Sequence, residues 1–244
     1  MIAQSRAELL KIRSTRTTLG LGLGMVAIIL LFVILAGLLS DLNGLAGAEN
    51  ERQFFGTGSG SGLFAALAGI MLVTGEYRFG TIRPTLLFTP RRSTVLNAKV
   101  IASVLAGIAL AVTGEVLAVA VGEVILHSRG VAVDLDRHDW TLLTIGTVGG
   151  TALWGAIGVG LGMIVRNQVG AIIGLLAWLF LVENLLFGLA PSVGRYVPSQ
   201  AQNALMGFTT DHLLSPAAGA AVLVVWTVVL CVVGAALAAR RDVS

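Results

Sequence analysis

Long apolar runs separated by short polar stretches dominate this chain, and each run has about the length of a membrane-spanning helix. A helix needs about 20 mostly apolar residues to cross the hydrocarbon core of a bilayer. Six runs meet this requirement: 18–39, the uncharged stretch within 53–75, 100–126, 140–165, 169–190 and 216–239. The pattern predicts an all-α integral membrane protein with six transmembrane helices.

Residues that favour helix starts support several of these boundaries. Asp139 is predicted to cap the fourth span, because a carboxylate can accept from the free N–H groups of a first turn. The pairs Thr89-Pro90 and Ser215-Pro216 each place a hydroxyl before a proline, which suits the first helical position.

Glycines affect two further expectations. Gly58, Gly60 and Gly62 lower helix propensity, so the start of the second span is predicted to be loose. Small residues at four-residue spacing let helix backbones approach closely in lipid and predict a packed bundle. These pairs are Gly20 and Gly24, Gly146 and Gly150, Gly158 and Gly162, and Gly170 and Gly174.

Composition agrees with a bilayer environment. Only 12% of the 244 residues are charged, against about 25% in soluble domains, and the mean hydropathy is +0.90. Twelve Lys and Arg residues fall on one side of the six spans and four on the other. The richer side is predicted to be cytoplasmic, which places both termini in the cytoplasm of a cell-membrane protein. This bias also explains the sequence pI of about 9.6 without nucleic-acid binding.

Candidate catalytic and metal-binding patterns are missing from the sequence. Cys231 is the single cysteine, and the three histidines are far apart. Neither lysine follows a glycine, as a phosphate-binding loop requires, since Lys11 follows Leu10 and Lys99 follows Ala98. We therefore expect no catalytic site, no metal and no nucleotide cofactor on this chain. An intramembrane enzyme is disfavoured because no matched catalytic residues appear.

The stretch 76–98 carries the most information. Charges alternate there with Phe79 and Phe88, which fits either a short amphipathic helix at the membrane surface or an ordinary basic loop. The order of residues resembles the cytoplasmic loop of type-2 ABC exporter permeases. The resemblance rests on Glu76, Gly80-Thr81, Leu86-Leu87, Pro90, Arg92 and Lys99, with Glu8 to Arg13 before the first span, Tyr196 to Pro216 before the last, and Arg240-Arg241-Asp242 at the end.

This resemblance implies a single permease domain over 1–244. It contains an interfacial segment at 1–16, a coupling loop at 76–98 and an outer loop at 191–215. The partners implied are two copies of an ABC ATPase subunit, which would hold ATP and magnesium, and a second permease chain, identical or related. Coupling to the ATPase is expected at Glu76, Arg78, Gly80, Thr81, Arg83, Pro90, Arg91 and Arg92.

Placing an acidic residue inside a membrane-spanning helix costs free energy, so such a residue is expected to have a structural or functional role. Glu115 and Glu183 are predicted to lie at similar depth, and two interpretations stay open for both. One is substrate contact or gating; the other is a structural partner such as Arg195 or Asn184. Glu123 is predicted to lie at the membrane surface.

The predicted function is export of an amphiphilic or lipid-soluble substrate, driven by the separate ATPase. The alternative is a non-transporting sensor or immunity subunit that also binds an ATPase. Within the outer segment, Ser199 is predicted to cap a short helix through Leu205, and a plain loop is the alternative. Membrane lipids are expected around the whole bundle.

Overall fold

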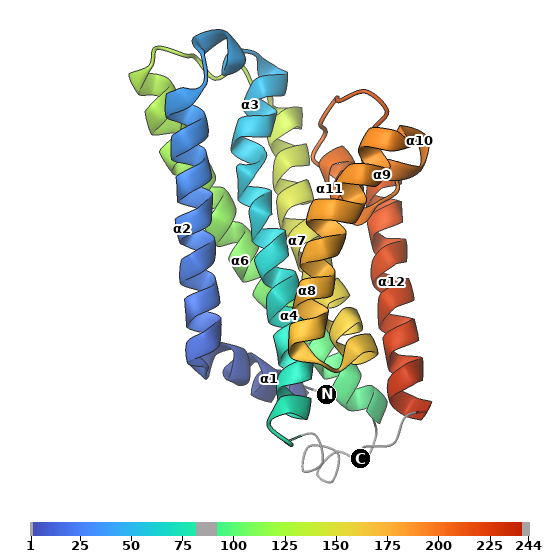
Figure 1. The fold of residues 1–244 in the computed structure, drawn as a ribbon. Helices are drawn as coiled ribbons and strands as arrows, with labels where there is room; N and C mark the ends of the chain where they lie inside the picture. The colour runs from blue at the N-terminus through green and yellow to red at the C-terminus, as the bar shows by residue number, and fades with distance from the viewer. Residues whose placement is uncertain (1, 82–91, 241–244) are drawn as a thin grey trace.

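The computed structural model describes residues 2–81 and 92–240. The described residues form helices and their connections, with no strand among them (Figure 1). Six helical stretches are long and apolar enough to cross a membrane, which confirms the predicted all-α class with six spans. They are Arg16–Leu39, Ala48–Arg78, Ser93–Ser128, Arg137–Val165, Gln168–Leu189 and Pro216–Arg240.

The helices follow one another with short connections. In chain order they are α1 (Ile2–Ser14), α2 (Arg16–Leu39), the 3₁₀ turn η1 (Leu42–Gly44), α3 (Ala48–Phe55), the 3₁₀ segment η2 (Gly56–Gly60), α4 (Ser61–Arg78), α6 (Arg92–Ser128), α7 (Arg137–Val165), α8 (Gln168–Ala177), the π-helical segment η3 (Trp178–Val182), α9 (Glu183–Leu189), α10 (Pro191–Gly194), α11 (Pro198–Leu205) and α12 (Pro216–Arg240). We call the two ends of the bundle the α1 end and the α3 end. In Figure 1, α1 crosses the foot of the upright helices at the α1 end.

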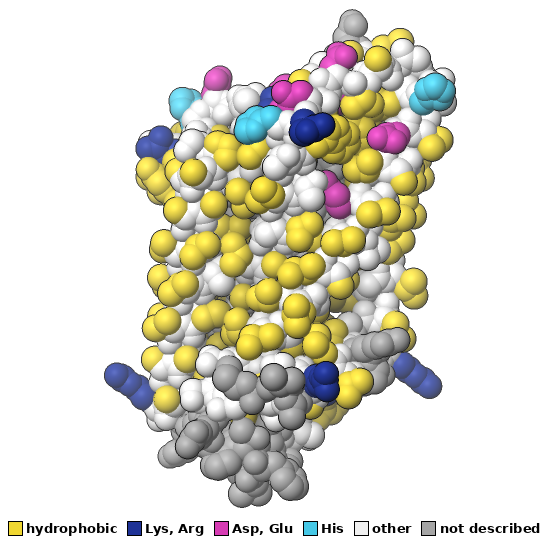
Figure 2. Space-filling model, turned by 180° about the vertical axis from the view of Figure 1, so that it is seen from behind, with side chains coloured by type: hydrophobic (Ala, Val, Ile, Leu, Met, Phe, Trp, Pro, Cys, Tyr) yellow, Lys and Arg dark blue, Asp and Glu magenta, His cyan; other side chains and the backbone are white. Residues whose placement is uncertain are grey.

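Two helices form the centre of the bundle. In the most apolar part of Ala48–Arg78 and of Arg137–Val165, 61% and 67% of the residues are buried. The other four spans are between 11% and 28% buried, and they present apolar side chains outward (Figure 2). The outer helices therefore suit contact with the hydrocarbon of a bilayer, while α4 and α7 make the internal core.

Glycines explain how closely α4 and α7 approach. A Cβ atom on Gly158 would lie 2.0 Å from the carbonyl oxygen of Ala66, and one on Gly69 would lie 2.2 Å from that of Gly155. The predicted role of small residues is thus confirmed for the fourth span. In the first span a Cβ on Gly24 would lie 3.8 Å from Phe64, an ordinary contact, whereas one on Gly20 or on Gly174 of the fifth span would meet nothing within 4 Å. The glycines of these two spans therefore make no comparably close approach within this chain.

Two local predictions need correction at the α3 end. The glycines before the second span do not leave it loose: a Cβ on Gly58 would lie 2.9 Å from Glu115 Oε2, so the 3₁₀ segment packs directly on α6. The cap of the fourth span is Asp136, whose side chain accepts from Asp139 N at 2.8 Å. The side chain of Asp139, at the third helical position, accepts in turn from the backbone N–H of Asp136, which completes a capping box.

The connection before the last span enters the bundle as α11. Gln202 accepts from Trp154 Nε1 at 2.8 Å and donates to the carbonyl of Gly146 at 3.3 Å. Met206 packs on Gly146, and a Cβ on Gly150 would lie 2.6 Å from Gln202 Nε2. Gly150 is 13 residues after the first residue of α7, or about 20 Å along that helix. This segment is therefore a short helix packed against α7 and α12, not a surface loop.

Candidate functional site

A cluster of four charged side chains, three of them buried, joins three helices at the α1 end. Lys99 of α6 lies 2.9 Å from Glu8 Oε2 of α1 and 2.8 Å from Glu76 Oε1 of α4. Lys11 of α1 lies 2.9 Å from Glu8 Oε1 and 2.8 Å from the same Glu76 oxygen. Lys99 also donates to the carbonyl of Leu72 at 3.2 Å. The cluster fixes α1 against the ends of the second and third spans.

The cluster contains two acids and two bases, so its formal charges cancel. Glu8 and Lys99 are fully buried, whereas the Lys11 side chain is 45% exposed. Burial lowers the pKa of Lys11, but hydrogen bonds to Glu76 and Glu8 raise it, and the resulting pKa is above its ordinary value. Lys11 is therefore charged at neutral pH. Glu76 Oε2 is buried with no hydrogen-bond partner in the described part of the chain.

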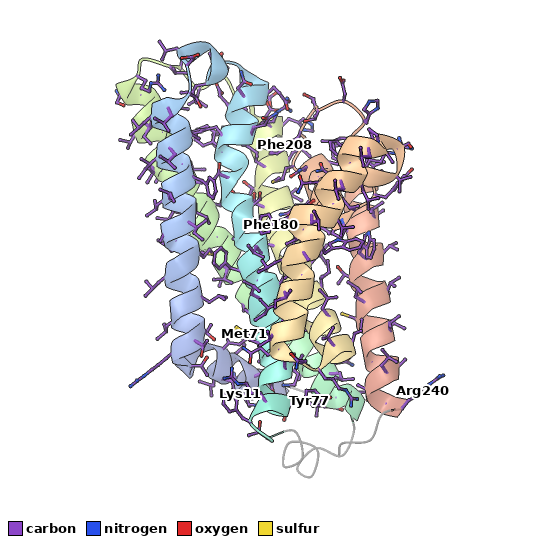
Figure 3. The ribbon with its side chains drawn as sticks, in the orientation of Figure 1. Lys11, Met71, Tyr77, Phe180, Phe208 and Arg240 are labelled. Carbon is purple, nitrogen blue, oxygen red and sulfur yellow. The ribbon has the colours of Figure 1, made fainter. Side chains whose placement is uncertain are left out.

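A pocket of about 580 Å³ lies beside this cluster. Its walls come from α1, the start of α2, the last turns of α4 and the first residue of α8. Lys11 and Met71, both in its lining, are labelled in Figure 3. The lining residues are Lys11, Ile12, Thr15, Thr17, Thr18, Ala68, Met71, Leu72, Gly75, Glu76, Arg78, Phe79, Thr81 and Gln168.

The residues predicted to couple to an ATPase are placed differently from one another. Glu76 is only 6% exposed and engages both lysines of the cluster. Arg78, Gly80 and Thr81 are exposed at the α1 end, where Arg78 Nη1 donates to Gln168 Oε1 at 3.3 Å. Arg83, Pro90 and Arg91 lie outside the described residues, and Arg92 is the first residue of α6.

The two acids of the spans have different surroundings. Both carboxylate oxygens of Glu115 are buried without a hydrogen-bond partner among the described residues. The Thr147 hydroxyl lies nearby but outside hydrogen-bond geometry to Glu115, and it contacts Met206 Sδ at 3.7 Å. Glu115 packs against Gly58 at the junction of η2 and α6.

Glu183 is fully hydrogen-bonded at a helix junction. Trp178 Nε1 donates to Oε1 at 2.7 Å, while Ser199 N donates to Oε2 at 3.2 Å and the Ser199 hydroxyl contacts the same oxygen. The capping position of α11 is held by Val197, so the predicted cap by Ser199 is wrong. Glu183, from another helix, accepts a hydrogen bond from the backbone N–H of Ser199 in the first turn of α11 instead. The suggested partners Arg195 and Asn184 bond elsewhere, to the Tyr196 hydroxyl and to the carbonyl oxygens of Leu179 and Phe180.

Sequence reasoning missed Glu8 and Lys99 as members of a site. Lys99 was counted among loop charges, yet it lies well inside α6 with its side chain buried. The available signal was the rarity of lysine, since the chain has only two and both enter the cluster. In the part of the chain that the structure describes, no three His, Cys, Asp or Glu side chains come together as a metal site would need.

No protein-family model matches this chain, and no curated protein sequence matches it either. The structure establishes a helical protein with six helices able to span a membrane, and it supports assignment as a multi-pass membrane protein.

Proposed function

We propose that this chain is the membrane-spanning permease subunit of an ATP-driven exporter of the type-2 ABC kind. A separate ATPase subunit, present in two copies, docks at the α1 end, and a second permease chain completes the assembly. The substrate is amphiphilic or lipid-soluble and leaves the cell. The outer faces of α2, α8, α9 and α12 are largely unburied, which suits contact with lipid and with that second chain.

The observation that carries the proposal is the four-charge cluster. It ties α1 to the last turns of α4 and the first turns of α6, and these two helices flank the segment expected to contact the ATPase. A push on that segment would move α1, α4 and α6 together, because breaking a buried charge pair is strongly unfavourable. Since α4 packs on α7 at the centre of the bundle, such motion would reach the core.

The orientation of the chain is tested with single cysteines. The expected arrangement places the α1 end in the cytoplasm, because 12 of the 16 Lys and Arg residues belong to that side. In a Cys231→Ser background, Asp134→Cys and Arg240→Cys put an exposed thiol at opposite ends of the bundle. An impermeant thiol reagent added to intact cells should label position 134 only. Labelling of position 240 alone would reverse the orientation.

The exporter proposal is tested with the affinity-tagged chain purified from its native membrane. An ATPase subunit should co-purify, and Arg83→Ala should weaken its binding by up to about fivefold, the range for one exposed ionic contact. Arg137→Ala, which removes an exposed base at the α3 end, is the control and should bind normally.

Transport by the reconstituted complex decides between the two candidate functions. Movement of an amphiphile that depends on ATP supports the exporter. A complex that binds the ATPase and hydrolyses ATP without moving any substrate supports the sensor or immunity subunit. The absence of any ATPase partner contradicts both.

A further inference from the structure

The pocket at the α1 end is lined by side chains of two chemical kinds. Lys11, Arg78 and the threonines at positions 15, 17 and 18 are basic or carry hydroxyls. Ile12, Ala68 and Met71 are apolar. A ligand that suits both kinds of side chain has a polar head and an apolar body.

The charge of the lining favours an anionic head. Lys11 is already paired with Glu8 and Glu76, so Arg78 is the positive charge of the lining that pairs with no acid among the described residues. Arg78 uses one N–H of its guanidinium on Gln168 and stacks on Phe79, with its centre 5.5 Å from the ring. Its remaining N–H donors are available to the oxygens of a phosphate.

The start of α2 adds to the same preference. This 24-residue helix begins beside the pocket, and the Thr15 hydroxyl bonds the Thr18 hydroxyl at 2.7 Å and makes no capping hydrogen bond to the first turn. The helix α8 also begins there, but Asn167 caps it by accepting from Gly170 N at 2.8 Å. The positive end of the α2 dipole therefore favours an anion at this position.

The surroundings of the pocket offer a path for acyl chains. Leu19 and Leu23 of α2 are 61% and 71% exposed, and Val169 and Ile173 of α8 are 65% and 60% exposed. Both helices pack against α4, whose residues Ala68 and Met71 line the pocket. An amphiphile seated here would therefore keep its tail on surfaces that face the hydrocarbon of the bilayer.

We propose that this pocket binds an anionic glycerophospholipid from the membrane leaflet at the α1 end, with its phosphate held by Arg78 beside the start of α2. The lipid is a bound structural partner of the interfacial helix α1. The proposal requires that the chain spans a bilayer and does not depend on whether it transports a substrate.

Two variants test the site by different means. Arg78→Gln removes a charge from the pocket and should weaken phosphatidylglycerol binding by about fivefold, the usual share of one basic residue near a membrane. Gly75→Leu fills the pocket without changing charge, because a Cβ on Gly75 meets nothing within 4 Å. It should abolish that binding. Native mass spectrometry of the purified full chain, titrated with the lipid, measures both.

Matched controls separate a built site from general attraction. Arg16→Gln removes an exposed base that does not line the pocket, and Gly149→Leu adds bulk at an open position of α7. Both should bind phosphatidylglycerol normally, and phosphatidylethanolamine should bind more weakly than phosphatidylglycerol to the unaltered chain. Equal weakening by Arg16→Gln and Arg78→Gln would overturn the proposal. So would unchanged binding in Gly75→Leu, or displacement of the lipid by millimolar inorganic phosphate.

Discussion

Replacing Lys99 with Met is expected to lower the free energy of unfolding by about 3–5 kcal/mol. The substitution leaves Glu8 and Glu76 as buried carboxylates that share only the half-exposed Lys11. Removing one partner of a buried ion pair is more harmful than removing the pair, because the remaining charge keeps its desolvation penalty. Unfolding of the purified chain in mixed micelles, followed by far-UV circular dichroism, measures the change.

Two further variants are compared with Lys99→Met in the same unfolding experiment. Lys11→Met acts on the same two carboxylates from an exposed position and should have a clearly smaller effect, because water screens that pair. Adding Glu8→Gln to Lys99→Met removes one acid along with one base and should recover part of the lost stability. Wild-type stability in Lys99→Met would show that the cluster does not hold α1 in place.

The pH dependence of this cluster follows from the direction of the Lys11 shift. Its pKa is raised in the folded protein, so the stabilisation is fully present below the ordinary lysine pKa. It is lost only as the pH rises through the raised value. The attachment of α1 should therefore be insensitive to pH across the physiological range, as far as Lys11 is concerned.

Hydropathy predicted the spans well because the bilayer imposes their length and their composition. The first span was expected at 18–39 and occupies Arg16–Leu39; the last was expected at 216–239 and occupies Pro216–Arg240. The third extends further at its start, because α6 begins at Arg92. Charges near the start of that helix lie within it rather than in a loop, and hydropathy alone cannot distinguish the two.

Tertiary partners were the part that sequence patterns could not supply. Asp136 and Asp139 are both acidic and three residues apart, so either could cap a helix until the fold selects the first. Lys99 and Glu8 are 91 residues apart, and only the position of α1 beneath the bundle brings them together. Gly58 lowers helix propensity locally, yet the approach of α6 makes it a tightly packed position.

Glu115 and Glu183 also show that sequence patterns do not reveal tertiary partners. Both acids lie in apolar stretches of sequence, but they differ in the hydrogen-bond donors around them. The carboxylate of Glu183 accepts from the Trp178 indole and from Ser199, while that of Glu115 has no such partner among the described residues. Depth and hydropathy predict the same free-energy cost of insertion for both acids. The presence or absence of donors on neighbouring helices decides what each does.

Opposite responses to glutamine are therefore expected at the two acids. In Glu183→Gln, the new amide N–H₂ must face either the Trp178 donor or the Ser199 donor, so at least one buried donor loses its acceptor. The expected loss of stability is about 1–3 kcal/mol, the usual penalty for an unsatisfied buried group. In Glu115→Gln no hydrogen bond is lost, and a buried group that can ionise is replaced by a neutral one, so stability should stay equal or rise.

Measuring stability and transport on the same samples separates structure from function. Glu123→Gln is the control, because Glu123 is exposed on the same helix as Glu115 and should change neither quantity. If Glu115→Gln keeps its stability and loses ATP-dependent transport, the unpaired carboxylate acts in the substrate path or in gating, where its charge is needed. If transport is also kept, Glu115 has no such role. In the structure, the Glu183 carboxylate accepts from three donors, the Trp178 indole and the backbone N–H and hydroxyl of Ser199. A Glu183→Gln protein as stable as the unaltered chain would therefore contradict the view that Glu183 holds α11 in the bundle.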